Sequence, residues 1–552
     1  MPISAAIPAP TRAISVDAGN PHFRMENGYL LNNAGDVLYA AANAEPPPGG
    51  RRGVQNIPAS VKRIAKLAMY GEDVSGMTLP AGLKTIEAGA FADSFGWSVA
   101  PTQLPNSITT IGENAFIDTD FAGALPTSLT SLGRYAFALF FPPEHFPAPL
   151  TNIVTPPCLK KIPEGCFARL PGYPKLNLTL SEGLEVIGKN AFRCAGLSTV
   201  LLPASLRSMD ATAFSGLATW EDISPLTAYE VASGNTYLKA DDGVLFSADG
   251  KTLLAWPQSK TPNYQIPDGT EQIGPHAFAN SYLAGFNDGL PSAGLLMVPA
   301  SVTQFHASAF NVDTNYRKQA NAYFLGPAPE LSGGAGHGPM VINYNSAHRA
   351  SWEAKLDEGA EPPTYGGYAV SMFAGGVIVP TIARQDGVSG DAEPFFRNQL
   401  ALLAGMEGTD TNGVTLRYTL DGFAPTTDSP AVEDGTITIP DTEGNSLVSL
   451  APFRAVGDEE LPCGPTVTRR YIDTSAINAA LDNDDLDFST DVIVPWTPDN
   501  SFEYGSPSDG RMESFSKHTN SRESWLQTSV TGPGMLSFWW RASLVVSDFT
   551  FA

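Results

Sequence analysis

The sequence predicts a β-rich solenoid followed by β-sandwich domains, and three observations lead to this prediction. An apolar frame of fixed length recurs nine times between residues 57 and 325. Glycine and proline number 52 and 46 among 552 residues, a turn-rich usage that favours many short strands over long helices. After the repeats, short runs alternate apolar and polar residues, as half-buried strands do.

Each repeat unit runs from a proline to an aromatic residue eleven positions later, as from Pro80 to Phe91. We number the places of a unit from that proline, so Phe91 occupies place eleven. Aliphatic residues recur at places three and six, and a small residue stands at place ten. One such unit cannot bury its apolar face alone, whereas stacked units bury a shared one. The residues at place eleven, which we expect to fill the interior, are Met69, Phe91, Phe116, Phe137, Phe167, Phe192, Phe214, Phe278 and Phe310.

A second kind of unit occurs twice. Residues 16–38 match residues 231–253 at a constant offset of 215, without a gap. Asn-Gly at 27–28 and Asp-Gly at 242–243 are dipeptides that tolerate positive φ in tight hairpin turns. Each unit is therefore predicted to be a small β-meander inserted in the array.

The chain is predicted to divide into five parts. These are residues 1–56, an N-terminal meander and loop; 57–325, the solenoid, with the second meander at about 226–257; 326–367, an array-closing strand and a linker; 368–473, a β-sandwich; and 474–552, a partial β-sandwich. Residues 341–344 should form the last strand of the array, with Trp352 packed on it, and residues 358–367 should form the linker. Repeat-like sequence begins by Ile14 and the last sandwich needs more strands, so we expect the natural protein to extend beyond both ends.

The repeat frame resembles a known family. Residues 79–91 read LPAGLKTIEAGAF, which fits the LPxxLxxIxxxAF pattern of leucine-rich repeats of the BspA-like bacterial surface-protein type. Residues 16–23 and 242–246 are similar to inserts found in the same arrays. The resemblance covers about residues 14–325, with Ser181 in place of one proline and Met69 in place of one aromatic. It implies a curved solenoid, surface display and binding to other macromolecules, and it implies no catalysis.

Two further resemblances lie downstream. Residues 416–426 read LRYTLDGFAPT, similar to a motif of the chitobiase/hexosaminidase C-terminal type β-sandwich, a non-catalytic accessory module. Phe423 replaces the usual small polar residue of that motif, and Asp421 is predicted to form a turn. Residues 532–540 resemble β-sandwich modules of large bacterial repeat proteins. Trp539 and Trp540 are adjacent and must face opposite sides of a strand, so one is a candidate for stacking on sugar.

The charge and the cysteine usage exclude some classes of function. A net charge of −24 and a pI near 4.6 disfavour nucleic acid and anionic membrane surfaces as partners. No apolar run of about 18 residues is present, so membrane insertion is not predicted. The four cysteines form no CxxC pair and no zinc-type spacing. Cys166 occupies a small place of the frame and is predicted to be buried, and a disulfide to Cys158 is permitted by the spacing without being implied.

No residue constellation points to catalysis. The sequence contains no phosphate-binding glycine loop, no GxSxG and no HExxH. The seven histidines are scattered singly, and His276 and His306 are expected to face solvent. The acidic residues 482–487 leave two alternatives, a solvated turn and a Ca²⁺ site, and the spacing is not that of an EF-hand. We therefore predict no enzyme activity, no cofactor and no metal site.

The spacing between units varies only after the aromatic residue, at 93–101, 138–155 and 168–179. Insertions confined to one point of a repeat map to one face or edge of a solenoid. We call these stretches the inserts. Their aromatic residues, which we expect to be exposed and to be candidates for partner binding, are Phe95, Trp97, Phe140, Phe141, Phe146 and Tyr173. The alternative is that they fold back over the array as local plugs.

Two functions are compatible with this organisation. The first is a bacterial surface or secreted protein that mediates protein–protein interaction or adhesion through its solenoid. The second is a carbohydrate-binding accessory region of a larger polysaccharide-processing protein. The expected partner is a protein or a glycan, and the family resemblance implies an extracellular or cell-surface location.

Overall fold

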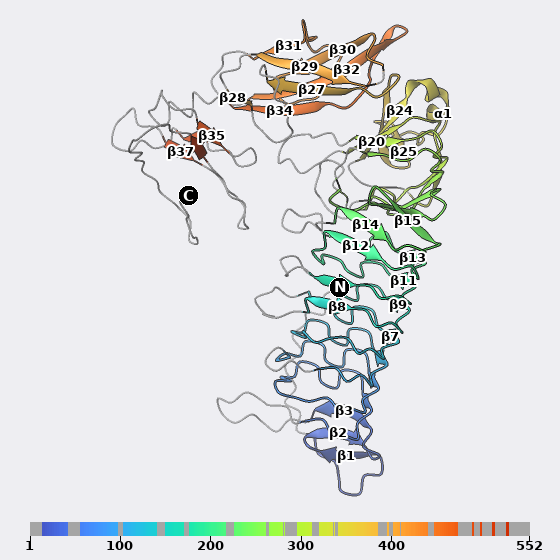
Figure 1. Ribbon diagram of the computed structural model, residues 1–552, viewed down its shortest axis with the longest axis vertical. Coiled ribbons are helices and arrows are strands. Elements are labelled where there is room, and N and C mark those ends of the chain that lie inside the picture. The colour runs from blue at the N-terminus through green and yellow to red at the C-terminus, as the bar shows by residue number, and fades with distance from the viewer. Residues whose placement is uncertain are drawn as a thin grey trace.

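The protein is elongated, with the N-terminal strands at one end of a stack and two larger sheets at the other (Figure 1). The computed structural model describes residues 14–41, 56–97, 103–140, 150–169, 176–216, 226–260, 264–279, 281, 295–311, 320–334, 336, 340–384, 395–396, 401–408, 410–439, 446–472, 488–490, 497–499, 511–513 and 526–528.

One side of the stack is a row of short strands. The first meander supplies β1 (Phe23–Glu26), β2 (Tyr29–Asn32) and β3 (Val37–Ala41), which pair antiparallel as predicted. Each following unit adds one parallel strand at places five and six. These strands are β4 (Arg63–Ile64), β5 (Thr85–Ile86), β6 (Thr110–Ile111), β7 (Ser131–Leu132), β9 (Lys161–Ile162), β11 (Val186–Ile187) and β13 (Ser208–Met209).

The second meander begins a new sheet on the same side. Its strands β15 (Leu238–Asp241), β16 (Val244–Ser247) and β17 (Thr252–Ala255) pair antiparallel, which confirms the predicted meander. Parallel strands then resume, namely β19 (Gln272–Ile273), β21 (Gln304–His306) and β23 (Glu330–Ser332).

The other side of the stack carries a second set of strands, several of which end just before the proline position of a unit. β8 (Asn152–Val154) pairs with β10 (Asn177–Thr179), and β12 (Thr199–Leu202) pairs with β14 (Ala228–Val231), both in parallel. A longer sheet follows, made of β18 (Tyr264–Gln265), β20 (Leu295–Val298), β22 (Ala320–Phe324), β24 (Met340–Asn345) and β26 (Tyr368–Phe373) in parallel, with β25 (Thr364–Tyr365) antiparallel at its edge.

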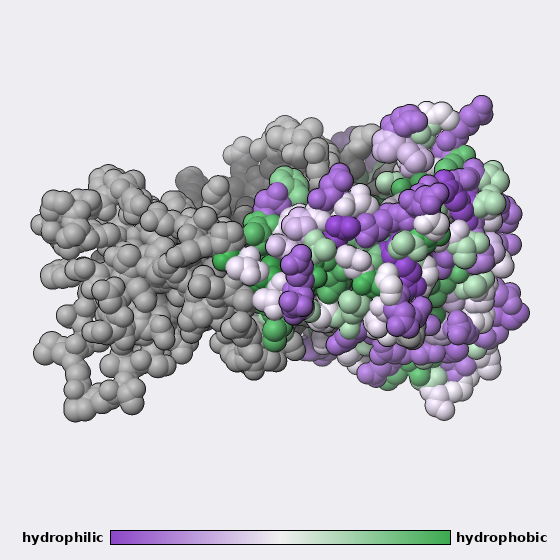
Figure 2. Space-filling model, turned by 90° about the horizontal axis from the view of Figure 1, so that it is seen from above, coloured by the Kyte–Doolittle hydropathy of each residue, from purple (hydrophilic) through white to green (hydrophobic). Residues whose placement is uncertain are grey.

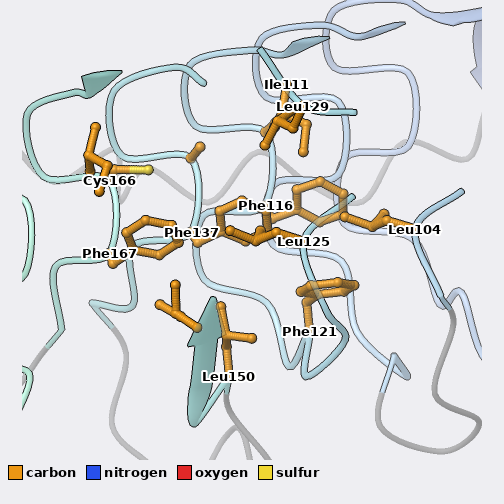
Figure 3. Close-up of a cluster of buried hydrophobic side chains, with 14 of the residues drawn as sticks. Leu104, Ile111, Phe116, Phe121, Leu125, Leu129, Phe137, Leu150, Cys166 and Phe167 are labelled. Carbon is orange, nitrogen blue, oxygen red and sulfur yellow. The ribbon is translucent and has the colours of Figure 1, made fainter. Parts of the chain in front are cut away.

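Stacked phenylalanines fill the interior between the two sides. Phe91, Phe116 and Phe137 lie 5.3 and 5.1 Å apart, ring centroid to ring centroid, and their planes differ by 16° and 3°. The column continues through Phe167 and Phe192, and Figure 3 shows Phe116, Phe137 and Phe167 in line. The backbone fixes the spacing, because in seven of the nine units the N–H at place eleven donates to the carbonyl at place ten of the next unit, at 2.8–2.9 Å. The place-eleven prediction is thus confirmed, since all nine of these side chains are buried.

Trp256 extends this column where no repeat unit exists. Its backbone N–H donates to the Ala277 carbonyl at 2.7 Å. The centroid of its ring lies 5.5 Å from that of the Phe278 ring. Trp256, which directly follows β17, therefore takes the structural role of place eleven. Ala41, 215 residues earlier, makes the corresponding bond to the Ala68 carbonyl at 3.1 Å.

The array ends later than predicted. Residues 341–344 form part of β24, but β26 pairs with it in parallel, so β24 is not the last strand. Residues 358–367 are also no simple linker, because the Asp357 carboxylate accepts hydrogen bonds from the Gly366 and Gly367 N–H groups and from the Thr364 hydroxyl. After η2 (Ser346–His348), α1 (Arg349–Glu353) carries Trp352, which stacks on Tyr344 at 5.4 Å as predicted.

Two sheets after the array enclose a separate apolar cluster. One contains β27 (Val379–Arg384), β29 (Ala401–Glu407) and β31 (Thr436–Thr438), and the other contains β28 (Phe395–Phe396), β34 (Val467–Ile472), β32 (Ser446–Val456) and β30 (Val414–Thr419), with β33 (Glu459–Pro462) paired to β32. Their shared cluster includes Ile382, Leu402, Leu416, Ile437, Val448 and Leu450. Figure 2 views this end and shows hydrophilic and hydrophobic residues intermixed over the described surface.

The final part contributes two short strand pairs, β35 (Phe488–Thr490) with β38 (Leu526–Thr528) and β36 (Thr497–Asp499) with β37 (Arg511–Glu513). The acidic stretch 482–487, Trp539 and Trp540 lie outside the described residues. No disulfide joins the four cysteines, which all lie within the described ranges, and Cys166 is buried as predicted. Among the described residues, no helix is long and apolar enough to cross a membrane.

Candidate interaction surface

The inserts lead from the aromatic column to the side of the stack that carries β8, β10, β12 and β14. Figure 1 shows this side opposite β7, β9, β11 and β13. A parallel bridge joins Leu139 of one insert to Arg169 of the next, and another joins Phe95 to Asp73 of the preceding turn. We call the described residues 93–97 and 138–140 the insert edge. Phe141, Phe146 and Tyr173 lie outside the described residues.

Phe95 is exposed on a fixed backbone. Its side chain is 45% exposed, although its N–H donates to the Glu72 carbonyl at 3.1 Å and its carbonyl accepts from the Val74 N–H at 2.9 Å. Both bonds tie the backbone of Phe95 to the preceding turn, so the backbone that carries the exposed ring is already ordered.

Phe140 is presented in a similar way two turns farther along. Its side chain is 41% exposed, and its N–H donates to the Asp118 carboxylate. The ring lies 6.1 Å from the Tyr135 ring, at a tilt of 53°. Phe95 follows β5 and Phe140 follows β7, so roughly 10 Å, two strand spacings, separates their positions along the stack.

Trp97 corrects the expectation that the insert aromatics are exposed. It is 1% exposed and packs edge-on against Phe91 at 5.0 Å and against Phe121 at 5.6 Å. Its indole N–H donates to the Ser94 hydroxyl at 2.9 Å, which satisfies the only polar atom that burial of the side chain removes from water. Trp97 is thus a local plug, whereas Phe95, two residues earlier, is exposed.

The carboxylates along the insert edge bind the chain itself. Asp120 accepts from the N–H groups of Gly96 and Trp97 at 3.3 and 3.0 Å. Asp73 accepts from the Ser75 N–H and hydroxyl at 3.0 and 2.5 Å. A hydrogen bond to Asp93, together with burial, raises the pKa of Tyr70 to about 12. Within the described residues, no group of three or more His, Cys, Asp or Glu side chains is arranged to hold a metal ion.

The adjoining strands carry exposed aliphatic residues that sequence reasoning did not select. Val154 on β8 is 52% exposed and Leu201 on β12 is 57% exposed. Leu201 stands between the buried Val200 and Leu202. Successive side chains of a strand point to opposite faces, so Leu201 points outward. The same alternation could have been used to select Leu201 from the sequence. Val154 and Leu201, together with the insert edge, form what we call the candidate flank.

The two array histidines are half-buried and do not simply face solvent as expected. Nδ1 of His306 lies 3.1 Å from the Ser308 nitrogen, whose N–H donates to it, and 2.8 Å from the Ser308 hydroxyl. His276 adopts a φ of 56° at place nine of its unit. Both are therefore engaged in local turn geometry.

Phe423 is a separate exposed aromatic, on the turn after β30. Its side chain is 74% exposed, and its N–H donates to the Asp421 carboxylate at 3.1 Å, which confirms Asp421 as a turn former. The Thr419 hydroxyl donates to the Phe423 carbonyl at 2.6 Å. The ring thus projects from a turn that is hydrogen-bonded on both sides.

The first part of the array is similar to a known repeat family. Residues 55–142 and 145–235 match the family model described as "BspA type Leucine rich repeat region", in six copies. No curated protein matches the chain.

Two solved structures are similar to this chain. The pneumococcal vaccine antigen PcpA is 15% identical, with a TM-score of 0.33, over 64% of this chain and 98% of that one. A leucine-rich repeat protein from Eubacterium ventriosum is 13% identical, with a TM-score of 0.28, over 60% of this chain and 78% of that one.

Proposed function

We propose that this protein is a non-catalytic surface or secreted bacterial protein that binds another protein through the candidate flank. The observation that carries the proposal is the pair Phe95 and Phe140, two exposed aromatic rings held on the same edge by backbone bonds to neighbouring turns. Aromatic residues that are rigid before binding lose little conformational entropy on binding and are enriched among residues that dominate interface energy.

The surroundings of the two rings suit a protein partner. Val154 and Leu201 add exposed apolar area on the adjoining strands, and the nearby carboxylates are engaged in holding the inserts. An interface centre of this kind is apolar with few free charges. Adhesion, secretion and surface display are part of the proposal, and the match of residues 55–235 to a surface-protein repeat family supports them.

A second candidate function is glycan binding by the two-sheet unit, and Phe423 is the observation that favours it. Its ring is 74% exposed on a hydrogen-bonded turn, a presentation that suits stacking on a sugar ring. The similarity of residues 416–426 to a chitobiase-type accessory β-sandwich supports this alternative.

The test applies the purified chain to an array of secreted and cell-surface proteins and to a glycan array. Under the proposal, at least one protein binds saturably. The double substitution Phe95→Ser and Phe140→Ser then weakens that binding about tenfold or more, as loss of a central aromatic anchor does.

The matched control is Phe423→Ser, which removes an exposed ring from a different unit. Protein binding that is unchanged by Phe423→Ser and lost with the flank double variant supports the proposal. Saturable glycan binding that Phe423→Ser abolishes favours the second function, and binding to neither array counts against both.

A further inference from the structure

The outer face of the row of short strands differs in charge from the rest of the chain. The side chain at place six points into the core, as at Ile64, Ile86 and Ile111, so the side chain at place five, its neighbour in the strand, points outward. We call places four and five of the seven units from β4 to β13 the strand face. It lies on the side of the stack opposite β8, β10, β12 and β14, and therefore opposite the candidate flank (Figure 1).

The composition of the strand face is unlike that of the whole chain, which has 33 Lys or Arg and 57 Asp or Glu. Two places in seven units give fourteen positions, and these hold six cations, six hydroxyl side chains, one carboxylate and one valine. The cations are Lys62, Arg63, Lys84, Lys160, Lys161 and Arg207. The hydroxyl side chains are Thr85, Thr109, Thr110, Thr130, Ser131 and Ser208. The strand face is thus a positive surface on an acidic protein.

Ion pairs within the array neutralise only part of this charge. Arg63 pairs with Glu87 of the next unit at 3.0 Å. Lys160 and Arg207 both contact Glu185, the one carboxylate of the strand face, at 3.1 and 3.5 Å. These contacts engage three of the six cations.

The other three cations have no carboxylate partner. Lys62, Lys84 and Lys161 are exposed, and none of them forms a salt bridge within the described part of the chain. The two carboxylates that border the face at place eight contact Arg134 of their own row, at 3.1 and 3.7 Å. Asp210, at place seven, accepts hydrogen bonds from the N–H and the hydroxyl at place nine of its own unit. Three lysines are therefore available to an anionic ligand.

Hydroxyl side chains occupy the middle of the strand face. Thr85, Thr110 and Ser131 are direct neighbours in register on β5, β6 and β7. Lys84 precedes β5 and Lys161 begins β9, so three strand spacings, roughly 15 Å, separate them along the stack. The face is therefore a strip of hydroxyl groups with an unpaired lysine toward each end.

This composition discriminates between classes of partner. The centre of a protein interface is usually apolar, and the strand face has a single apolar side chain, Val186. Single-stranded nucleic acids are held by bases stacked on aromatic side chains, and the strand face has none. Hydroxyl side chains both donate and accept hydrogen bonds, and lysines attract negative groups. The strand face is complementary to a chain that carries hydroxyl groups together with regularly placed negative charges.

We propose that the strand face binds an acidic polysaccharide, a glycan chain that bears carboxylate or sulfate groups. The chain runs across the strands, with its anionic groups on Lys62, Lys84 and Lys161 and its hydroxyls on the threonine and serine side chains between them. The candidate flank lies on the opposite side of the array, so a protein partner there and a polysaccharide here can be bound together.

The experiment measures binding of the full chain to polygalacturonate and to heparin at low salt, with dextran as the uncharged polysaccharide. We expect saturable binding to at least one of the two acidic polysaccharides and none to dextran. Raising the salt concentration should weaken the binding, because interactions between exposed charges are screened. Phe95→Ser with Phe140→Ser should leave it unchanged, so this test and the test of protein binding succeed or fail independently.

The double substitution Lys84→Gln and Lys161→Gln should weaken the binding about fivefold or more, as loss of two surface charge pairs does. Lys84→Arg with Lys161→Arg keeps the charge and should restore it. The matched control is Lys66→Gln with Lys189→Gln. It removes two exposed lysines at place eight, outside the strand face, and so changes the net charge equally while binding should stay within about twofold.

Four outcomes would overturn the proposal. The first is the absence of saturable binding to both acidic polysaccharides at low salt. The second is an equal loss in the two glutamine variants, which would assign the attraction to net charge alone. The third is equal binding to dextran, which would leave the lysines without a role. The fourth is tighter binding to polyglutamate or to double-stranded DNA, lost with Lys84→Gln and Lys161→Gln, which would assign the face to an acidic protein or to nucleic acid.

Discussion

Place nine of the repeat unit lies in the left-handed region of backbone space in most units. Place nine has a φ between 53° and 61° in seven units, and the residues there are Leu67, Gly89, Asn114, Tyr135, Gly165, Asn190 and His276. Glycine and asparagine tolerate this conformation, whereas other residues are strained in it. The repeated turn therefore accounts for the left-handed backbone of His276.

A serine hydroxyl at place two forms a hydrogen bond between successive turns. Ser107 and Ser205 occupy this place, and each hydroxyl donates to the place-three carbonyl of the preceding unit, at 2.6 and 2.8 Å. Cys158 occupies the same place in its unit, is exposed and is free. The corresponding carbonyl is that of Leu129.

We expect Cys158→Ser to stabilise the array, because the new hydroxyl can donate to the Leu129 carbonyl. A hydrogen bond of this kind contributes about 1 kcal/mol. The measurement is the free energy of unfolding in urea under reducing conditions. Ser107→Ala is the matched comparison and should lose a similar amount, so an unchanged or lowered stability of Cys158→Ser would contradict the prediction.

At the scale of the element, the insert at 93–97 combines a plug and an exposed ring. Trp97 lies within 5.6 Å of two aromatic rings of the column, Phe91 and Phe116, and of Phe121. Its backbone N–H donates to the Asp120 carboxylate of the next turn. Phe95 contributes no such packing and is exposed. The two side chains should therefore differ sharply in their contribution to stability.

Trp97→Ala is expected to lower the free energy of unfolding by about 3–5 kcal/mol, as large-to-small changes at buried aromatics do. Phe95→Ala should change it by less than about 0.5 kcal/mol, since surface substitutions rarely exceed that value. Urea unfolding of both variants, with local hydrogen exchange at residues 91–97, checks the difference. Equal effects of the two substitutions would show that the insert is not packed as described.

The contrast between Trp97 and Phe95 marks what the sequence could and could not predict. The eleven-residue frame predicted the buried column, because a periodic apolar pattern needs only local counting. The direction of Trp97 depends on Ser94 in its own turn and on Asp120 in the next, and no spacing rule joins those residues. Trp256 escaped prediction for the same reason, since its role at place eleven appears only once the meander is stacked.

At the scale of the whole molecule, charge divides the chain. Residues 1–216 contain 16 Lys or Arg and 16 Asp or Glu, whereas residues 217–552 contain 17 and 41. The first half of the array is therefore neutral, with ion pairs across turns such as Arg63 with Glu87 at 3.0 Å and Arg134 with Glu113 at 3.1 Å. The argument from net charge against anionic partners consequently applies to the second half, and the candidate flank around Phe95 and Phe140 lies in the neutral one.

The end of the array should make the protein sensitive to alkaline pH. Burial raises the pKa of Tyr365 and of Tyr368 to about 12, whereas an unperturbed tyrosine has a pKa of about 10. The Tyr368 hydroxyl donates to the Ala307 carbonyl and lies 3.1 Å from Asn311 Oδ1. Both hydroxyls therefore keep their protons longer in the folded protein than in the unfolded chain.

The sign follows from this difference in protons bound. Below about pH 10 both states are protonated and the contribution to stability is fully present. As the pH rises from about 10 toward about 12, the unfolded chain loses its protons first, so the free energy of unfolding must fall. Thermal unfolding followed by circular dichroism, from about pH 8 to about pH 12, should show a midpoint that declines steeply only in the upper half of this range.

Tyr368→Phe separates the titration from general alkaline damage. The variant should be less stable at neutral pH, because the bond to the Ala307 carbonyl is lost, and its midpoint should decline less between about pH 10 and about pH 12, because one titrating group is gone. Burial also raises the pKa of Tyr29, Tyr229, Tyr264 and Tyr323, so part of the decline should remain in the variant. Parallel declines of the variant and the original chain would show that Tyr368 does not contribute to it.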